Sequence, residues 1–426
     1  MLSPDYPTDW KILPLMQITE RFLNGGTPST RVSEYWGGTI PWITGADAEQ
    51  SLTTGARKYI TEHGAQESST NIVPKGNILL VTRTGVGKVS IAGVDVAISQ
   101  DLTGVIPKWE LVDVTYLYRQ LMRLGTELQR LSQGTIILGV QREEVEALEI
   151  PLPLLLEQRR IAEILDTADE AIQQTERVIA KLKAIKAGLL HDLLTRGLDE
   201  GGHLRDTEAH PEQFKDSPLG RIPRKWEAIT IGELAVYVGS GATPRGGSEV
   251  YQSEGVVFIR SQNVAFDGLL LEDVAYIDEQ IHRDMARSEV FAYDVLLNIT
   301  GASIGRCCSV PEGLGLANVN QHVCAIRLPD PKHNDAIYLS AVLASDIGQH
   351  QIDQFNAGSN REGLNYGQLR SFVIPWPLES ERAHIAAVLG AHDARIRAEE
   401  AALKKLRQVK RGLMDDLLIG KVRVKV

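Results

Sequence analysis

The chain carries the same sequence pattern twice. The stretch "IPLPLLLEQRRIAEILDTADEAI" begins at Ile150, and "IPWPLESERAHIAAVLGAHDARI" begins 224 residues later, at Ile374. Ten of these 23 aligned positions are identical. At the same spacing, "KLKAIKAGLLHDLL" from Lys181 and "KLRQVKRGLMDDLL" from Lys405 share eight of 14 positions. A repeat of this kind constrains the fold more than any other feature, because both copies are expected to adopt one structure.

The repeat extends into the polar, glycine-rich parts of the chain. "PTDWKILPL" from Pro7 aligns with "PRKWEAITI" from Pro223, and "GTPSTRVSEYW" aligns with "ATPRGGSEVYQ". "LLVTRTGVGK" from Leu79 aligns with "VLLNITGASIGR" from Val295, which is two residues longer. We therefore predict a tandem duplication of two structural units.

The first part of each copy is typical of a mixed, mostly β domain. Short β-branched runs such as "NILLVT", "VVFIR" and "DVLLNIT" are bounded by turn signals such as "PKGN". Helical spacing is found in "TYLYRQLMRLGTELQRL" and in "DAIYLSAVLASDIGQHQI". We predict globular domains over residues 1–153 and 219–377.

The second part of each copy predicts a long helix, over residues 154–197 and 378–420. Prolines precede each segment and a glycine ends it, as is common at helix termini. Apolar residues recur in steps of three and four, the heptad spacing of helices that pair with each other. This predicted helix-pairing seam comprises Ile161, Leu165, Ile172, Ile179, Leu182, Leu189, Leu193, Ile385, Leu389, Ile396, Leu403, Leu406, Leu413 and Leu417.

The two helices are expected to pair in antiparallel orientation. A lone amphipathic helix would leave an apolar stripe in water, and the other copy is the simplest partner. Parallel pairing would require the second globule to reach back along a whole helix, whereas antiparallel pairing does not. Residues 198–218, which are polar and rich in turn formers, are expected to be an exposed linker. The predicted fold class is α+β, with two mixed, mostly β globular domains separated by two long antiparallel helices (a coiled-coil spacer) in a pseudo-twofold tandem repeat.

The sequence contains no recognisable catalytic or metal-binding motif. "TGVGK" lacks the spacing of a nucleotide-binding phosphate loop and predicts a turn, and the histidines are scattered. No catalytic residue and no metal ligand are predicted. Three cysteines, no apolar run long enough to cross a bilayer and no visible secretory signal indicate reduced thiols, no membrane association and a cytoplasmic location.

The formal net charge of -10 disfavours nucleic acid at first sight, because phosphate binding depends on Lys and Arg. Exposed charges are screened beyond about 8 Å in physiological salt, so a locally basic groove can still work on an acidic protein. We hypothesise that such a chain binds DNA better when a partner adds cationic surface.

Two similar globules on a stiff spacer suit double-stranded DNA, whose half-sites recur about 34 Å apart. Arg pairs with guanine, and Asn or Gln with adenine, through two hydrogen bonds. The loops of both copies hold such side chains among glycines. The predicted DNA-contacting residues are Thr44, Asp47, Arg83, Thr84, Lys88, Gln141, Arg142, Arg260, Ser261, Gln262, Asn263, Asn298, Thr300, Ser303, Arg306, Ser359, Asn360 and Arg361.

The order of these motifs resembles the specificity (S) subunit of type I restriction-modification systems. The resemblance rests on the two helix starts, on "FKDSPLGRIPRKWE" and on the paired "GTPS"/"ATPR" and "TGVGK"/"TGASIGR" loops, and it covers nearly the whole chain. One departure is that "SQGTIILGV" lacks the polar residues of its counterpart "AGSNREGL".

This resemblance implies two target recognition domains, each reading one half of a bipartite asymmetric DNA sequence, with the paired helices setting the gap. It implies two adenine methyltransferase (M) subunits that bind S-adenosylmethionine, and restriction/translocase (R) subunits that use ATP and magnesium. This chain itself is expected to bind none of these cofactors and to catalyse no reaction.

Two other functions stay open from the residues alone. The chain could be a protein-binding scaffold whose globules never touch DNA, or an enzyme whose site is assembled from unremarkable residues. A salt-sensitive affinity without sequence preference would argue against specific DNA recognition.

Overall fold

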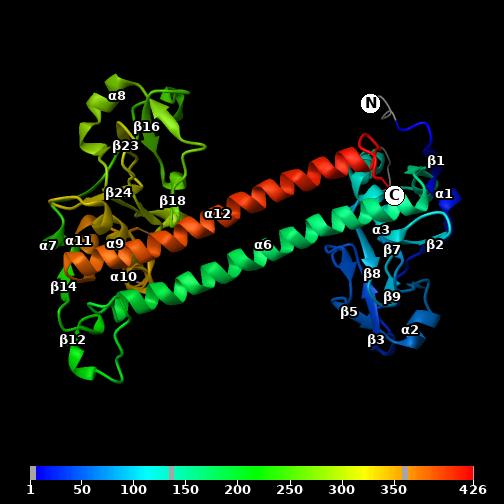
Figure 1. The fold of residues 1–426 in the computed structure, drawn as a ribbon, viewed down its shortest axis with the longest axis horizontal. Coiled ribbons are helices and arrows are strands. Elements are labelled where there is room, and N and C mark those ends of the chain that lie inside the picture. Colours follow the sequence, from blue (N-terminus) through cyan, green and yellow to red (C-terminus); the bar gives the residue numbers. More distant parts are fainter. Residues whose placement is uncertain (1–5, 134–138, 357–362, 426) are drawn as a thin grey trace. The chain divides into compact units, whose positions relative to one another are not determined.

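The computed structural model describes residues 6–133, 139–356 and 363–425. The chain divides into two compact units, which we call the first unit (residues 1–176 and 402–426) and the second unit (residues 177–401). Each unit therefore holds one globule together with half of each long helix (Figure 1). This division cuts both long helices, whereas the sequence analysis treated each helix as a segment of its own.

The globule of the first unit contains two sheets. The larger sheet has the strand order β2 (Thr19–Asn24), β10 (Leu102–Pro107), β7 (Ile78–Val81), β8 (Val89–Ala92), β4 (Leu52–Thr53). The smaller sheet has the order β5 (Lys58–Ile60), β3 (Trp36–Ile43), β9 (Val96–Ile98), β6 (Asn71–Val73). Strands β3 and β9 run parallel, so both end at the same edge of their sheet.

The globule of the second unit repeats this frame. One sheet has the order β15 (Tyr237–Ser240), β24 (Val323–Arg327), β21 (Val295–Asn298), β22 (Cys307–Ser309). The other has the order β19 (Ala275–Ile277), β16 (Val256–Ile259), β23 (Ala317–Val319), β20 (Glu289–Val290). Strands β16 and β23 run parallel, as β3 and β9 do. The hairpin of β17 (Val264–Ala265) and β18 (Gly268–Leu269) replaces β4 as a separate pair.

Each predicted helix within a globule is two shorter helices. α3 (Val114–Arg123) is followed by α4 (Gly125–Gln133), and α9 (His333–Ala344) is followed by α10 (Asp346–Asn356). α3 packs on β8 and α9 packs on β22, so equivalent helices cover equivalent strands. The remaining short helices are α1 (Leu15–Ile18), α2 (Glu62–Gln66), α5 (Arg142–Glu146), α7 (Ile231–Leu234), α8 (Glu279–Asp284) and α11 (Tyr366–Arg370).

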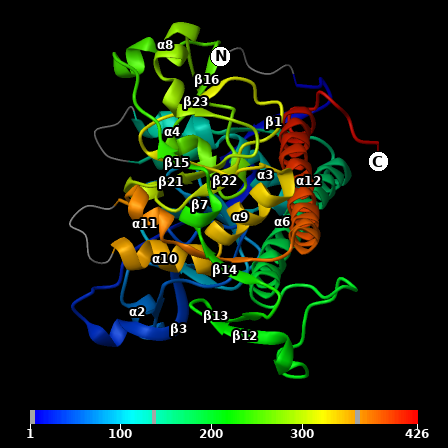
Figure 2. The ribbon, with the colours of Figure 1, turned by 90° about the vertical axis from the view of Figure 1, so that its left-hand side faces the viewer.

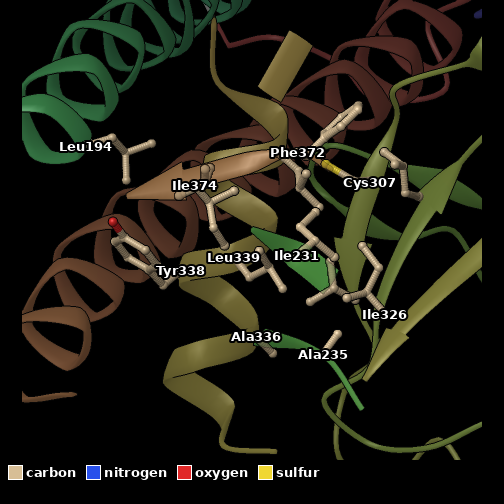
Figure 3. Packing of buried hydrophobic residues seen from close by; sticks show 14 of the residues in the cluster. Leu194, Ile231, Ala235, Cys307, Ile326, Ala336, Tyr338, Leu339, Phe372 and Ile374 are labelled. Atoms are coloured by element: carbon tan, nitrogen blue, oxygen red, sulfur yellow. The ribbon is translucent and has the colours of Figure 1, made fainter. Parts of the chain in front are cut away.

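A buried tyrosine connects each globule to the start of its long helix. β11 (Glu149–Leu152) pairs with β1 (Lys11–Pro14), and β25 (Val373–Trp376) pairs with β14 (Glu227–Thr230). The Tyr116 hydroxyl donates to the Pro151 carbonyl at 2.7 Å, and the Tyr338 hydroxyl donates to the Pro375 carbonyl at 2.9 Å. Figure 3 shows Tyr338 beside Ile374 within the buried apolar cluster of the second unit.

The two long helices are α6 (Leu155–Thr195) and α12 (Glu379–Leu417), with bounds within three residues of the predicted ones. In the first unit Asp169 pairs with Lys410, and Glu176 pairs with Arg407 at 2.7 Å. In the second unit Lys183 pairs with Glu400 at 2.7 Å, and Lys186 with Asp393. Residue numbers rise along α6 as they fall along α12, so the helices are antiparallel in each unit.

The repeat relates these ion pairs to one another. A shift of 224 residues places Asp169 on Asp393 and Glu176 on Glu400. It follows that the interactions found in the first unit recur in the second with the roles of the helices exchanged. The predicted fold class, with its tandem repeat and long antiparallel helices, is confirmed.

The predicted seam lies against the partner helix or the globule. Its members that are no more than 9% exposed are Ile161, Leu165, Ile172, Ile179, Leu182, Leu193, Ile385, Leu389, Ile396 and Leu417. The partly buried members are Leu189, Leu403, Leu406 and Leu413. Burial of about ten such side chains stabilises the long helices against each other and, near their ends, against the globules.

The segment predicted to be an exposed linker is more structured than its polarity suggested. β12 (Phe214–Ser217) and β13 (Gly220–Pro223) form an antiparallel hairpin (Figure 2). Leu198 and Phe214 are buried within the second unit, at 6% and 3% exposure. These apolar side chains anchor the segment, whereas most of residues 198–218 are exposed. The hairpin therefore adds local structure to a segment that was predicted only as an exposed linker.

Candidate nucleic-acid interface

Several strands of each globule end side by side, and the loops that follow them form one surface. In the first unit β2, β3, β7 and β9 end there, because Asn24 lies opposite Thr103, Val81 opposite Leu102 and Ile43 opposite Ile98. In the second unit the equivalent strands β15, β16, β21 and β23 end together in the same way. We call this surface the strand-end edge. It carries most of the predicted DNA-contacting residues.

In the first unit the strand-end edge surrounds a cavity of about 580 Å³. The predicted residues Arg83, Gln141 and Arg142 line it. Asn24 and Gln100, which the sequence analysis did not select, line it as well. Four segments far apart in the sequence thus bring amide and guanidinium groups around one concavity.

Positive charge at this edge is partly matched by carboxylates. The Arg142 guanidinium donates to Glu146 Oε1 at 2.6 Å and to Asn24 Oδ1 at 3.2 Å, and it lies 5.4 Å from the ring centre of Phe22. Lys88 Nζ lies 3.5 Å from Glu49 Oε1. Such solvent-exposed pairs are worth little energetically, so both cations remain able to meet a phosphate.

Three predicted DNA-contacting residues are buried and hold the loops instead. Asp47, whose side chain is 5% exposed, accepts hydrogen bonds from the Thr44 amide (2.9 Å) and hydroxyl (2.6 Å). Its counterpart Asn263, 2% exposed, accepts one from the Arg260 amide at 3.0 Å. Asn298 is fully buried and donates to the Ser261 carbonyl at 2.8 Å. Asp47, Asn263 and Asn298 were predicted to contact DNA bases. Their burial and hydrogen bonds show instead that they hold the loops in position.

Arg260 is partly held by its own globule. One of its terminal amino groups donates to the Asp273 carbonyl at 3.2 Å, and its guanidinium lies 5.5 Å from the Tyr251 ring centre. Its Nε is buried without a hydrogen-bond partner among the described residues. An arginine held in this way offers less of its guanidinium to a guanine than the sequence analysis assumed.

The other predicted residues differ in accessibility. Thr84 donates to Asp101 at 3.1 Å, and Thr300 lies 2.5 Å from His322 Nδ1, so both hydroxyls are engaged. Gln262 and Arg306 are exposed, while Ser261 and Ser303 are partly buried. Ser359, Asn360 and Arg361 lie outside the described residues.

A turn lies at the centre of each strand-end edge, and none of the predicted DNA-contacting residues belongs to it. Gln100 follows β9 and Gln321 follows β23, and both side chains are exposed. A threonine from the loop after the preceding glycines donates to each of them: Thr27 to Gln100, and Thr243 to Gln321. Aligning "SQDLTG" with "NQHVCA" would have revealed this glutamine in both copies.

The described residues hold no group of three or more His, Cys, Asp or Glu side chains placed to bind a metal ion. Cys307, Cys308 and Cys324 are free and buried. Burial raises the pKa of Cys308 and Cys324 to about 12, so these thiols stay protonated and unreactive at neutral pH. In the part of the chain that the structure describes, no helix is both long and apolar enough to cross a membrane.

A family model described as type I restriction modification DNA specificity domain matches residues 7–184 and again residues 223–408. The chain belongs to this family. The two matches fall on the two copies of the repeat, so the tandem duplication is a duplication of the specificity domain. The resemblance drawn from the motifs is confirmed, and with it a role in recognising a DNA sequence.

Two specificity subunits of type I restriction enzymes are similar over most of the chain. The MjaIX specificity subunit of Methanocaldococcus jannaschii is 29% identical over 308 residues, covering 70% of this chain and 68% of its own. The MjaVIII specificity subunit of the same organism is 24% identical over 424 residues, covering 98% and 94%. Both are named as subunits of type I restriction enzymes.

Solved structures show the same fold at lower sequence identity. A type I restriction-modification S subunit from M. genitalium has a TM-score of 0.60 at 15% identity, covering 98% of this chain and 97% of its own. A chain from a structural study of type I complex assembly and conformational transition has a TM-score of 0.58 at 16% identity, covering 99% and 100%.

Proposed function

We propose that this chain reads a bipartite, asymmetric DNA sequence, one half with each strand-end edge, on behalf of M and R partner subunits. One observation carries the proposal: the same arrangement of strands occurs in both units, but the side chains on its strand-end edge differ between them. Thr44 in the first unit corresponds to Arg260 in the second, and Asp101 corresponds to His322. Side chains that differ in hydrogen-bonding character favour different base edges, so two such edges suit two different half-sequences.

The chemistry of the edge fits a chain that shares its DNA contacts with partners. The edge of the first unit mixes Arg83, Lys88 and Arg142 with Glu49 and Asp101. Affinity for DNA depends mainly on the number of phosphates that cations neutralise. An edge of mixed charge therefore contributes more to base specificity than to overall affinity for the duplex. The methyltransferase subunits would then supply the remaining cationic surface.

The starts of the two long helices are suited to binding the same partner twice. Leu154 and Leu378 occupy equivalent positions in the repeat, and they are 76% and 59% exposed. Two exposed leucines in identical settings are consistent with one docking contact for each of two M subunits. The paired helices α6 and α12 would set the length of the gap between the half-sites.

Catalysis belongs to the partners in this proposal. The methyltransferase subunits would bind S-adenosylmethionine and modify adenines, and the R subunits would use ATP and magnesium. The specificity chain would contribute no catalytic group.

The test is to co-purify the chain with its methyltransferase partner and to select bound duplexes from a random pool. We expect a bipartite sequence with a fixed gap, bound on the order of 10³-fold or more tighter than random DNA at physiological salt. Affinity that is uniform over all sequences and falls steeply with salt would contradict the proposal, and would favour a scaffold that touches DNA only through its partners.

A further inference from the structure

The turn that follows β9 in the first unit is held from three sides. The Ser99 amide donates to the Ile43 carbonyl at 2.9 Å, and the Asp101 carbonyl accepts from the Arg83 amide at 3.2 Å. The Thr27 hydroxyl donates to Gln100 Oε1, and the Thr84 hydroxyl donates to Asp101 Oδ1 at 3.1 Å. The loops after β2, β3 and β7 thus all meet at this one turn.

The turn after β23 in the second unit is held in the same way. The Asn320 amide donates to the Ile259 carbonyl at 3.0 Å, and the His322 carbonyl accepts from the Ile299 amide at 2.9 Å. The Thr243 hydroxyl donates to Gln321 Oε1, and Thr300 contacts His322 Nδ1. Each of these four contacts of the first turn therefore has a counterpart in the second.

Each turn is approached closely by a glycine of the loop that bears the threonine. A Cβ atom on Gly25 would lie 1.7 Å from the Ser99 carbonyl oxygen, and one on Gly241 would lie 1.6 Å from the Val319 carbonyl oxygen. Only glycine permits this approach, which brings Thr27 and Thr243 within reach of the glutamines. The backbone is therefore shaped to orient Gln100 and Gln321.

The two turns differ in the side chain that follows the glutamine. The residue after the glutamine is Asp101 in the first unit and His322 in the second. The glutamine itself is retained and exposed in both, at the centre of an edge whose other side chains vary. A residue that only filled space would not need an exposed position and a dedicated hydroxyl partner.

We propose that Gln100 and Gln321 are base-reading residues, each contacting an adenine in the half-site bound by its own globule. An amide binds adenine through its NH₂ group and its carbonyl oxygen together. The carbonyl oxygen has two acceptor positions, and the threonine hydroxyl occupies one of them. In Gln100 the other acceptor position and the NH₂ group remain, in an amide plane that the threonine has already fixed. In Gln321 the NH₂ nitrogen also lies 3.1 Å from His322 Nε2, so one of its two N–H donors remains for a base. This inference rests on the proposed function, because it presumes that the strand-end edge faces DNA.

The arrangement lowers the entropic cost of reading a base. A free glutamine side chain loses much of its rotamer freedom when it is ordered. Thr27 and Thr243 remove part of that loss before DNA binds. Equivalent glutamines in both globules predict an adenine at equivalent positions of the two half-sites, even where the neighbouring bases differ.

The experiment measures binding of the chain, co-purified with its methyltransferase partner, to duplexes altered one base pair at a time. Gln100→Ala should reduce affinity by about 5- to 100-fold on the preferred duplex and abolish discrimination at a single base pair of one half-site. Gln321→Ala should do the same in the other half-site. Gln100→Glu retains an acceptor for Thr27 but loses the NH₂ donor, so it should behave like Gln100→Ala.

Matched controls are Gln66→Ala on α2 and Gln280→Ala on α8, both exposed glutamines outside the turns. They should leave every base preference unchanged, and all variants should unfold at the wild-type temperature. Equal weakening on every duplex would overturn the proposal, since it would place the glutamines on phosphates. Unchanged preferences in the Gln100 and Gln321 variants would overturn it too. Absence of sequence preference in the wild-type complex would instead reject the proposed function.

Discussion

Replacing Tyr338, whose hydroxyl is buried, should change the stability of the second unit by an amount that depends on pH. Tyr338 is fully buried, and its hydroxyl donates to the Pro375 carbonyl in the strand that leads into α12. The change Tyr338→Phe removes the donor and leaves the buried carbonyl without it. Leaving such a group unsatisfied costs about 1–3 kcal/mol. For a unit of this size we expect the melting temperature to fall by about 2–12 °C at neutral pH.

Alkaline pH should erase this difference. Burial holds the pKa of Tyr338 well above its ordinary value, so the unfolded chain releases this proton before the folded protein does. The stabilising contribution of the neutral hydroxyl is complete below pH ~10 and falls by about 1.4 kcal/mol per pH unit above it. Phenylalanine has no such proton. The deficit of the Tyr338→Phe variant should therefore shrink above pH ~10 and vanish about one to two units higher.

The assay is urea unfolding of wild type and variant at several pH values between 7 and 11.5. The quantity of interest is the difference between their free energies of unfolding at each pH. Ionisation of the buried cysteines cancels in that difference because both proteins contain them. The control is Tyr276→Phe on β19, a partly buried tyrosine whose hydroxyl has no hydrogen-bond partner among the described residues. A deficit for Tyr338→Phe that stays constant from neutral to pH 11 would refute the reasoning, as would a variant as stable as wild type at pH 7.

Four further outcomes are expected. Arg205→Ala leaves Glu381 buried without its guanidinium partner (both side chains are 10% exposed), and it should destabilise the second unit by about 3–5 kcal/mol in urea unfolding. Ile385→Ala, at a fully buried seam position, should cost about 2–5 kcal/mol, whereas Val409→Ala on the exposed side of α12 should change stability by less than about 0.5 kcal/mol. Arg83→Ala should relax discrimination in one half-site by about 1–3 kcal/mol in duplex binding, and uniform weakening would assign it to phosphate. Four residues inserted in both α6 and α12, about 6 Å of helix, should lengthen the preferred gap by about one or two base pairs in methylation mapping, and an unchanged gap would reject a ruler.

The architecture was predictable because it depends on signals that repeat along the chain. Heptad spacing gave the bounds of α6 and α12 within three residues, since apolar periodicity is a local property. The duplication then gave each helix its partner, and chain connectivity gave the antiparallel orientation. The ion pair of Asp169 with Lys410 and its counterpart Lys186 with Asp393 agree with that reasoning.

The role of single loop residues was not predictable, because it depends on turn geometry. Asp47 and Asn263 were chosen as polar side chains in glycine-rich loops, yet each bonds the backbone amide three residues earlier and is buried by doing so. Composition cannot distinguish a side chain that caps its own turn from one that faces solvent. Gln100 and Gln321 were missed for the opposite reason, since each is one exposed residue between two buried strands.

The polar composition of the segment between the copies did not indicate the β-hairpin that it forms. Phe214 and Ile222 flank the turn "SPLG" in a way that is typical of a hairpin, and both are buried. The polar residues around them suggested a linker, but two apolar anchors suffice to order a short segment against a large unit. Spacing between apolar residues was a better guide here than average composition.

The duplicated frame explains how one fold can serve two different half-sites. Two of the four contacts described for each turn join backbone groups, such as the Ser99 and Asn320 amides bound to the Ile43 and Ile259 carbonyls. Backbone contacts do not depend on which side chain a position carries. Exposed positions on the strand-end edge can therefore change without loss of stability, and under the proposed function the sequence that is read would change with them. Buried positions such as Asp47 do not have this freedom, because the shape of the loop depends on the carboxylate itself. Exchanging exposed edge residues between the two units should then alter specificity at wild-type melting temperature, whereas Asp47→Ala should lower both affinity and stability.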